Sequence, residues 1–278
     1  MLNLTRIKTK NLTGTSVFDP VLCEIIYSWF CTENGIVFDP FAGGSVRGIV
    51  AEILGRKYIG IDLSEKQVDA NQTTADAFGV YPAWHCDDSR NADKYIPDQS
   101  ADLVFSCPPY HNLEKYSNHP LDLSNMNYAD FLTAYREIIS KSCSKLKENR
   151  FAVFVVGDIR DSKGAYRDFV SQTKRMFQDC GLYLYNEIVL LNQYCTAPMR
   201  AGIPFSTSRK TAKVHQNVLV FYKGNIKDIR KNFKNDFKWA DLDKFKLKGV
   251  SQCGKGIQEE NQQSQSNERC LGAVQGKV

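Results

Sequence analysis

The segment Ser106-Cys107-Pro108-Pro109-Tyr110 combines residue types that suit chemistry on a planar ring bearing an amino group. Two consecutive prolines fix φ and lack N–H groups, so the backbone is extended and offers carbonyl oxygens that only accept hydrogen bonds. The aromatic residue that follows offers a face on which a ring can stack. Acceptors aimed at the amine hydrogens, beside such a face, suit methylation of an exocyclic amine on a base flipped out of its stack.

A second segment has the composition of a loop that binds a nucleotide-like ligand. The apolar run Ile36 to Phe38 leads into Asp39, Pro40, Phe41, Gly43, Gly44 and Ser45, and a helical pattern follows. Glycines allow a tight turn and a close approach of the backbone, and the N–H groups at a helix start favour a carboxylate or phosphate. The segment matches neither GxGxxG nor the GK[ST] of a P-loop, which disfavours dinucleotide and nucleoside triphosphate binding. A purely structural glycine turn is the alternative.

Acidic residues end the next two apolar runs. Asp62 follows Tyr58 to Ile61, and Asp87 and Asp88 follow Ala83 to Cys86. An acid at the first of these places can accept hydrogen bonds from both ribose hydroxyls of a nucleoside. Those at the second can accept from an adenine amino group. Each acid taken alone is more often a helix cap.

Strand-like and helix-like patterns alternate along the chain. We expect further strands at Asp102 to Phe105, Phe151 to Val156, Leu182 to Leu191 and Gln216 to Tyr222. We expect helices at Val46 to Leu54, Glu65 to Phe78, Tyr128 to Leu146 and Phe169 to Cys180. This order predicts an α/β fold with a doubly wound, mostly parallel sheet. Ligands of such sheets bind outside the carboxyl ends of the strands, where both segments above would lie.

Together, the glycine segment and the three acids resemble the S-adenosylmethionine-dependent methyltransferases. In that family the glycine loop holds the methionine part of the cofactor, and the acids hold ribose and adenine. The tetrapeptide Cys107 to Tyr110 is similar to the [DNS]PP[YFW] signature of the DNA methyltransferases that modify adenine N6 or cytosine N4. The resemblance covers roughly residues 15 to 224. It implies a seven-stranded, Rossmann-like sheet, S-adenosylmethionine as cofactor, and double-stranded DNA with one base flipped out as substrate.

Two further features bear on this resemblance. The segment around Phe18, Asp19 and Pro20 resembles the family segment that closes over the methionine end, although a packing helix that starts at proline explains the same letters. Cys107 departs from the signature, and a thiol is a weak acceptor. The hydrogen-bonding role then falls to the Pro108 carbonyl with help from Ser106 or a neighbouring side chain, and the choice between adenine and cytosine stays open.

The basic residues are concentrated late in the chain. No acid occurs from Ile188 to Lys227, and this window contains Arg200, Arg209, Lys210 and Lys213, which we expect to contact nucleic acid phosphates. A solvated basic surface is the alternative. We expect a catalytic domain over residues 1–224, a basic extension over 225–248, and a disordered tail over 249–278, where Gln, Ser and Gly replace large apolar residues.

Composition excludes several classes of protein. No stretch approaches the ~20 apolar residues of a membrane span, and we expect a cytoplasmic protein. Nine cysteines without a CxxC pair favour reduced thiols, and no metal site is expected. Three other hypotheses stay open: a guanine-N2 methyltransferase of RNA, a glutamine methylase of release factors, which the basic window disfavours, and a catalytically silent subunit that binds DNA, which the Cys107 departure supports.

Overall fold

A seven-stranded sheet in the order β3-β2-β1-β4-β5-β7-β6 forms the centre of the fold in a computed structural model. The structure describes residues 18–111, 119–191 and 197–233, without the side chains of 197–200. The strands are β1 (Ile36–Asp39), β2 (Lys57–Asp62), β3 (Ala83–Cys86), β4 (Ala101–Ser106), β5 (Leu146–Val156), β6 (Tyr183–Leu191) and β7 (His215–Lys223). The first five are parallel, and β7 runs antiparallel to both β5 and β6. The predicted fold class is confirmed.

The helices agree with the sequence pattern, with two additions late in the described part of the chain, the second of them only four residues long. They are α1 (Pro20–Phe30), α2 (Val46–Ile53), α3 (Glu65–Asp76), α4 (Tyr128–Lys145), α5 (Phe169–Asp179), α6 (Ala197–Ser208) and α7 (Ile229–Asn232), with 3₁₀ turns η2 (Ser89–Lys94), η4 (Leu123–Asn125) and η6 (Ile226–Asp228). The sequence did not predict α6, because Gly202 and Pro204 both disfavour a helix interior. Among the described helices, none has the length and apolar content needed to cross a bilayer.

Helices cover both faces of the sheet and create two cores. Phe38, Val104 and Phe154 pack on the face covered by α4 and α5. Val37 and Phe105 pack on the opposite face, which α1 and α2 cover. Because the central strands are buried on both faces, their sequences are nearly continuous apolar runs rather than alternating ones.

The chain divides into two units at residue 234, and residues 235–278 lie outside the part that the structure describes. Within the described part, Ile229 and Phe233 pack against the second core, although they follow the predicted end of the catalytic domain at residue 224. The predicted extension and tail stay predictions.

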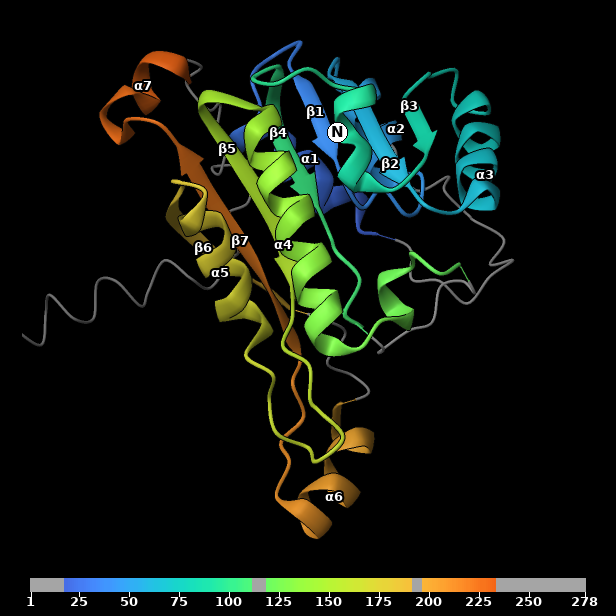
Figure 1. The fold of residues 1–278 in the computed structure, drawn as a ribbon, viewed down its shortest axis with the longest axis vertical. Helices are drawn as coiled ribbons and strands as arrows, with labels where there is room; N and C mark the ends of the chain where they lie inside the picture. The colour runs from blue at the N-terminus through green and yellow to red at the C-terminus, as the bar shows by residue number, and fades with distance from the viewer. Residues whose placement is uncertain (1–17, 112–118, 192–196, 234–278) are drawn as a thin grey trace, which may run out of the picture. The chain divides into compact units, whose positions relative to one another are not determined.

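The parallel strands all end at the same edge of the sheet, which we call the carboxyl edge. Beyond it stands a protrusion formed by α6 and the residues up to 214, which we call the arm (Figure 1). The loop 157–168, which we call the bracing loop, contacts the arm at two lysines. Lys210 lies so close to Gly164 that a Cβ on that glycine would be 2.5 Å from its Nζ, and the Nζ of Lys213 is 3.7 Å from Oδ2 of Asp158.

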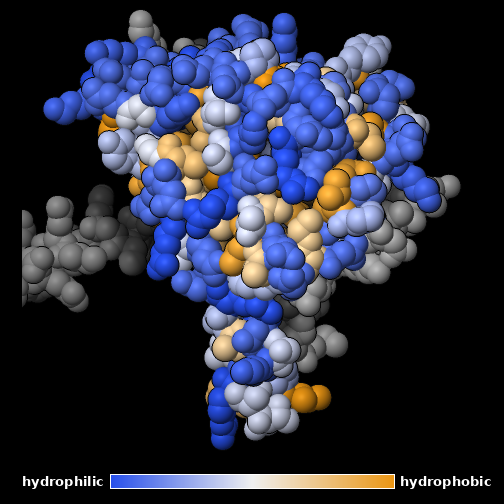
Figure 2. Space-filling model, in the orientation of Figure 1, coloured by the Kyte–Doolittle hydropathy of each residue, from blue (hydrophilic) through white to orange (hydrophobic). Residues whose placement is uncertain are grey.

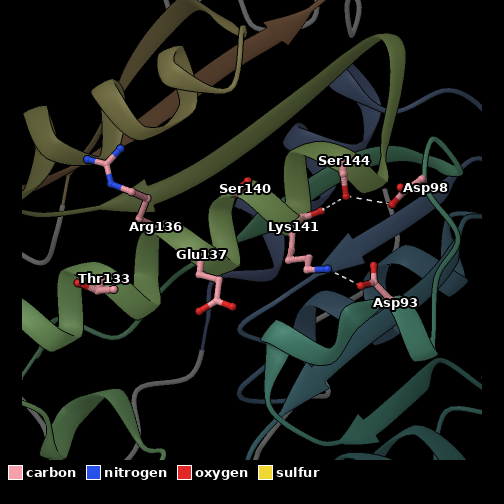
Figure 3. Close-up of a pocket in the computed structure, with 8 residues that line it drawn as sticks. All are labelled: Asp93, Asp98, Thr133, Arg136, Glu137, Ser140, Lys141 and Ser144. Atoms are coloured by element: carbon pink, nitrogen blue, oxygen red, sulfur yellow. Dashed lines mark hydrogen bonds and ion pairs between the residues drawn. The ribbon is translucent and has the colours of Figure 1, made fainter.

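A charged surface hollow lies between η2 and α4, and it contains none of the predicted site residues (Figure 3). Its lining residues are Asp93, Asp98, Thr133, Arg136, Glu137, Ser140, Lys141 and Ser144. Asp93 forms ion pairs with Lys141 and Lys145, which connect η2 to α4. These ion pairs account for the charged side chains of Asp93 and Lys141 in the lining of the hollow.

The ion pairs of Asp93 predict a specific pH dependence. Hydrogen bonds from Lys141 and then Lys145 lower the pKa of Asp93 to about 2. A lowered carboxyl pKa stabilises the fold above the ordinary pKa, and this contribution is lost as the pH falls through the folded-state value. We expect the difference in free energy of unfolding between wild type and Asp93→Asn to be larger at about pH 6 than at about pH 3. Urea denaturation at both pH values measures it, and a difference independent of pH contradicts it.

Candidate active site

The loop after β1 is held by side chains from two neighbouring elements. Gly43 has φ +49°, a left-handed conformation that glycine adopts without strain. Its N–H donates to Oδ2 of Asp62 at 2.9 Å, and its carbonyl accepts from Nδ2 of Asn71 on α3 at 2.7 Å. Apart from Gly44 itself and its two chain neighbours, no heavy atom of the described residues lies within 4 Å of the position of a Cβ on Gly44. The loop is thus fixed on one side and open at Gly44, which fits a bound ligand.

Asp62 holds this loop from the end of β2. Its Oδ1 accepts the N–H of Ser64 at 2.8 Å while its Oδ2 accepts that of Gly43. Burial raises the pKa of Asp62 above its ordinary value, against the effect of these two hydrogen bonds. Each carboxylate oxygen can accept more than one hydrogen bond, so the carboxylate can also receive ribose hydroxyls.

The two acids after β3 have partners within the chain. Asp88 accepts the N–H of Arg90 at 2.9 Å, which caps η2, and pairs with the guanidinium of the same residue at 2.6 Å. Asp87 accepts from Nζ of Lys94 and the hydroxyl of Tyr95, both at 2.8 Å. Desolvation opposes its charge, yet these hydrogen bonds hold the pKa of Asp87 well below its ordinary range. Asp88 therefore caps a helical turn, as the alternative interpretation of these acids predicts. Contact of Asp87 and Asp88 with adenine stays a prediction.

Asp39 is the centre of a buried polar cluster that joins the two motifs of the sequence. Its side chain is fully buried and accepts hydrogen bonds from Nε of Arg47 at 2.6 Å and the hydroxyl of Tyr58 at 2.7 Å. A third comes from Oγ of Ser106 at 2.5 Å. Asp39 ends β1 and begins the loop that runs to Ser45, which we call the glycine loop. Ser106 ends β4 and begins the loop that runs to Tyr110, which we call the proline loop. This contact therefore connects the two loops directly.

Arg47 extends this cluster into the glycine loop. Its guanidinium donates to the carbonyl oxygens of Phe41 at 2.7 Å and Ala42 at 2.9 Å, and it lies 4.6 Å from the ring centroid of Phe18. Burial disfavours the charged form, but the adjacent Asp39 carboxylate raises the pKa of Arg47 above its ordinary value. Phe18 therefore lies over the side chain that shapes the glycine loop, shortly before α1, and its contact with the cofactor stays a prediction.

Ser106 and Pro108 are buried, whereas Cys107, Pro109 and Tyr110 are partly exposed. The hydroxyl of Ser106 is engaged with Asp39 and with the N–H of Phe41 at 3.2 Å. Its observed contacts join the two loops. The sequence assigned it instead to the target amine, a role that stays untested.

Tyr110 is held in place by its hydroxyl and its ring edge. Nε2 of Gln216 on β7 donates to the hydroxyl at 2.6 Å, and the hydroxyl donates to the Val155 carbonyl at 3.4 Å. The Sγ of Cys107 lies 3.9 Å from the same hydroxyl, and the ring meets that of Phe169 edge-on, with centroids 6.3 Å apart. Burial raises the pKa of Tyr110 well above its ordinary value, so the phenol is neutral.

His111 directly follows the proline loop in an uncommon backbone conformation. Its φ is +50°, and its Nε2 lies 2.9 Å from the Met126 carbonyl. Its ring meets those of Tyr128 and Phe131 edge-on at 5.3 Å. A left-handed conformation costs free energy in a residue other than glycine, and such strain is concentrated at functional sites.

Sequence reasoning missed four residues that shape this site: Arg47, Asn71, His111 and Gln216. Arg47 had a signal, because it lies within the glycine motif, eight positions after Asp39. Asn71 and Gln216 act from a helix and a strand that are distant in sequence from the loops they contact. No local pattern reveals such contacts.

The four basic residues predicted to bind nucleic acid lie on the arm. Arg209 is exposed, and its guanidinium lies 5.2 Å from the ring centroid of Phe205. Lys210 and Lys213 contact the bracing loop, as described above. Arg200 lies on α6, and its side chain is outside the described residues.

Part of the sequence that forms this site matches a known protein family. The family model described as "DNA methylase" matches residues 20–73, which include the glycine loop and Asp62. The resemblance to the DNA methylases is confirmed. At the level of enzyme class, the match supports a methyltransferase. No curated protein matched the sequence.

Solved structures share the fold at low sequence identity. The [4+2]-cyclase SpnF superposes with a TM-score of 0.51 and 13% identity, covering 74% of this chain and 81% of that one. A candidate sarcosine dimethylglycine methyltransferase from Galdieria sulphuraria superposes with a TM-score of 0.50 and 11% identity. This match covers 73% of this chain and 84% of that one. TrmN from Thermus thermophilus superposes with a TM-score of 0.49 and 15% identity. This match covers 74% of this chain but only about half, 49%, of TrmN. Because one of these proteins is a cyclase, the fold alone does not determine the reaction.

Proposed function

We propose that this methyltransferase transfers a methyl group from S-adenosylmethionine to the exocyclic amino group of adenine or cytosine in double-stranded DNA, after the base has been flipped out. The contact between Ser106 and Asp39 carries the proposal, because it joins the glycine loop to the proline loop at the carboxyl edge. A donor pocket and a base pocket built on these loops would therefore be adjacent, as direct transfer requires.

On the donor side, the chain's residues fit the cofactor. We assign the methionine part to Phe18 and to the glycine loop, residues Asp39, Pro40, Phe41, Gly43, Gly44 and Ser45. We assign ribose to Asp62 and adenine to Asp87 and Asp88. The open side at Gly44 supports the first assignment, and the remaining acceptor capacity of Asp62 supports the second. When bound, the cofactor supplies a methyl group on a positively charged sulfur.

On the substrate side, Tyr110 stacks on the flipped base and the Pro108 carbonyl accepts a hydrogen bond from the target amine. Pro109 keeps the loop extended, and Cys107 stands where the family signature has a stronger acceptor. The amine nitrogen forms the new N–C bond as the S–C bond breaks, and the nitrogen then loses one proton to solvent. No covalent bond to the enzyme forms.

Incubation with radiolabelled S-adenosylmethionine tests this function. Unmethylated plasmid DNA, transfer RNA and protein serve as separate acceptors. We expect label in DNA only. Label confined to transfer RNA supports the guanine-N2 hypothesis instead, and label in no acceptor while the cofactor still binds supports the silent-subunit hypothesis.

The ribose assignment of Asp62 makes a prediction about cofactor affinity. Hydrogen bonds to charged groups contribute about 1.5–3 kcal/mol each, so Asp62→Ala should weaken S-adenosylmethionine binding at least tenfold. Isothermal titration calorimetry measures the dissociation constant, and Asp69→Asn, an exposed acid on α3, is the control.

Because Asp62 also holds Gly43, a second ligand separates its two roles. A cofactor analogue lacking a ribose hydroxyl should lose less affinity than the full cofactor when Asp62 is replaced. Equal losses for both ligands would assign Asp62 to the loop alone, and an unchanged dissociation constant would remove it from the donor pocket.

A further inference from the structure

The helix α6, which Figure 1 shows in the outer part of the arm, carries large apolar side chains in an exposed position. Ile203 is 76% exposed, the highest value among the large hydrophobic residues that the structure describes, and Phe205 is 47% exposed. Figure 2 shows apolar atoms at the narrow end of the protrusion. We call the run Ile203-Pro204-Phe205 the tip. An exposed apolar group at the end of a protrusion is typical of an interaction surface.

The tip is supported well enough to act as a wedge. The N–H of Arg209 donates to the Phe205 carbonyl at 2.9 Å, and that of Lys210 donates to the Pro204 carbonyl at 3.3 Å. Lys210 also lies against Gly164 of the bracing loop. The backbone that follows the tip is therefore fixed both to α6 and to the body of the fold.

Charge around the tip indicates which partner it meets. The window from Ile188 to Lys227 has no acid, and Arg209 lies over the ring of Phe205, next to the apolar surface. A second copy of the chain would bring a like-charged arm to this surface, which electrostatic repulsion disfavours. Duplex DNA offers phosphates to the cations and base steps to the apolar side chains.

We propose that the tip inserts into a groove of duplex DNA and wedges apart a base step, bending the duplex. Isoleucine, proline and phenylalanine are all residue types that act as such wedges, and insertion kinks DNA by about 20–90°. The inference rests on the proposed function in taking DNA as the substrate. Its consequence is that the arm loosens the stack beyond the carboxyl edge, where the target base must leave it.

The test measures binding and bending of a duplex labelled with a fluorophore at each end. Fluorescence anisotropy over a series of salt concentrations gives affinity, and energy transfer between the ends gives the bend. The variants are Ile203→Ser at the tip, Arg209→Gln beside it, and Ile226→Ser as the matched control. Ile226 is also exposed, at 43%, but lies beyond the opposite end of β7.

We expect Ile203→Ser to bind about tenfold more weakly, because the apolar surface it would bury is lost, and to bend the duplex less. The slope of log affinity against log salt should stay unchanged, since no phosphate contact is removed. Arg209→Gln should reduce that slope by about one, and Ile226→Ser should behave as wild type.

Two results would overturn the inference: affinity and bend of Ile203→Ser equal to those of Ile226→Ser, or an effect of Ile203→Ser on self-association in sedimentation without one on DNA. Methyl transfer measured in parallel separates this inference from the proposed function. Bending that depends on the tip without methylation leaves the inference standing and removes the function. Methylation by a protein whose DNA affinity and bend do not depend on the tip leaves the function standing and removes the inference.

Discussion

Replacing Tyr110 with alanine is expected to lower kcat/KM for DNA methylation by about ten- to a hundredfold, while the Kd for S-adenosylmethionine stays nearly unchanged. Stacking of a base on an aromatic ring contributes about 1–3 kcal/mol, and each 1.4 kcal/mol is a factor of ten. The side chain contacts Gln216, Val155 and Phe169 rather than the glycine loop. The loss should therefore fall on the base and spare the donor pocket.

Tyr110→Phe is the matched control, because it keeps the ring and removes only the hydroxyl that Gln216 contacts. We expect it to retain most of the activity. Gln216→Leu should resemble Tyr110→Phe, since both break the same hydrogen bond. Steady-state kinetics with cofactor calorimetry measure these effects. Full activity in Tyr110→Ala, or an equal loss in Tyr110→Phe, would contradict stacking as the role of the ring.

Replacing Arg47 with methionine is expected to lower the free energy of unfolding by about 3–5 kcal/mol, the typical cost of breaking a buried ion pair from one side. The change leaves the buried carboxylate of Asp39 without its cation. It also removes the donor to the carbonyls of Phe41 and Ala42 in the glycine loop. Urea denaturation measures the loss.

The double variant Asp39→Asn/Arg47→Met is the control for this prediction. It removes the uncompensated charge, so we expect a smaller loss than in Arg47→Met alone. Tyr58 and Ser106 keep an oxygen acceptor at residue 39 in the double variant. A double variant less stable than the single one would show that the charge of Asp39 is not what makes the loss of Arg47 costly.

The fold could be predicted because its signals are local. Strands buried on both faces are apolar throughout, and the helices between them begin at recognisable caps, such as Ser64 for α3 and Asn127 for α4. The helix α6 could not be predicted, because its sequence contains Gly202 and Pro204 and its place on the arm depends on contacts such as that of Lys210 with Gly164.

The two motif segments of the site could also be predicted, because each is a short run whose residue types limit its chemistry. The contacts between them could not. Asp39 and Ser106 are 67 positions apart, and Tyr110 and Gln216 are 106 apart. Only the strand order brings β1 beside β4 and places β7 against β5. For the same reason the contacts of Ser106 with Asp39 and Phe41 could not be predicted, and its expected help at the target amine stays untested.

The most direct test of the proposed methylation is mass spectrometry of nucleosides from DNA incubated with the protein and S-adenosylmethionine. We expect N6-methyladenine or N4-methylcytosine, formed about ten- to a hundredfold more slowly when Tyr110→Ala replaces the wild type under the same conditions. Methyl groups found only at cytosine C5, or only in RNA nucleosides when transfer RNA is supplied, would contradict it.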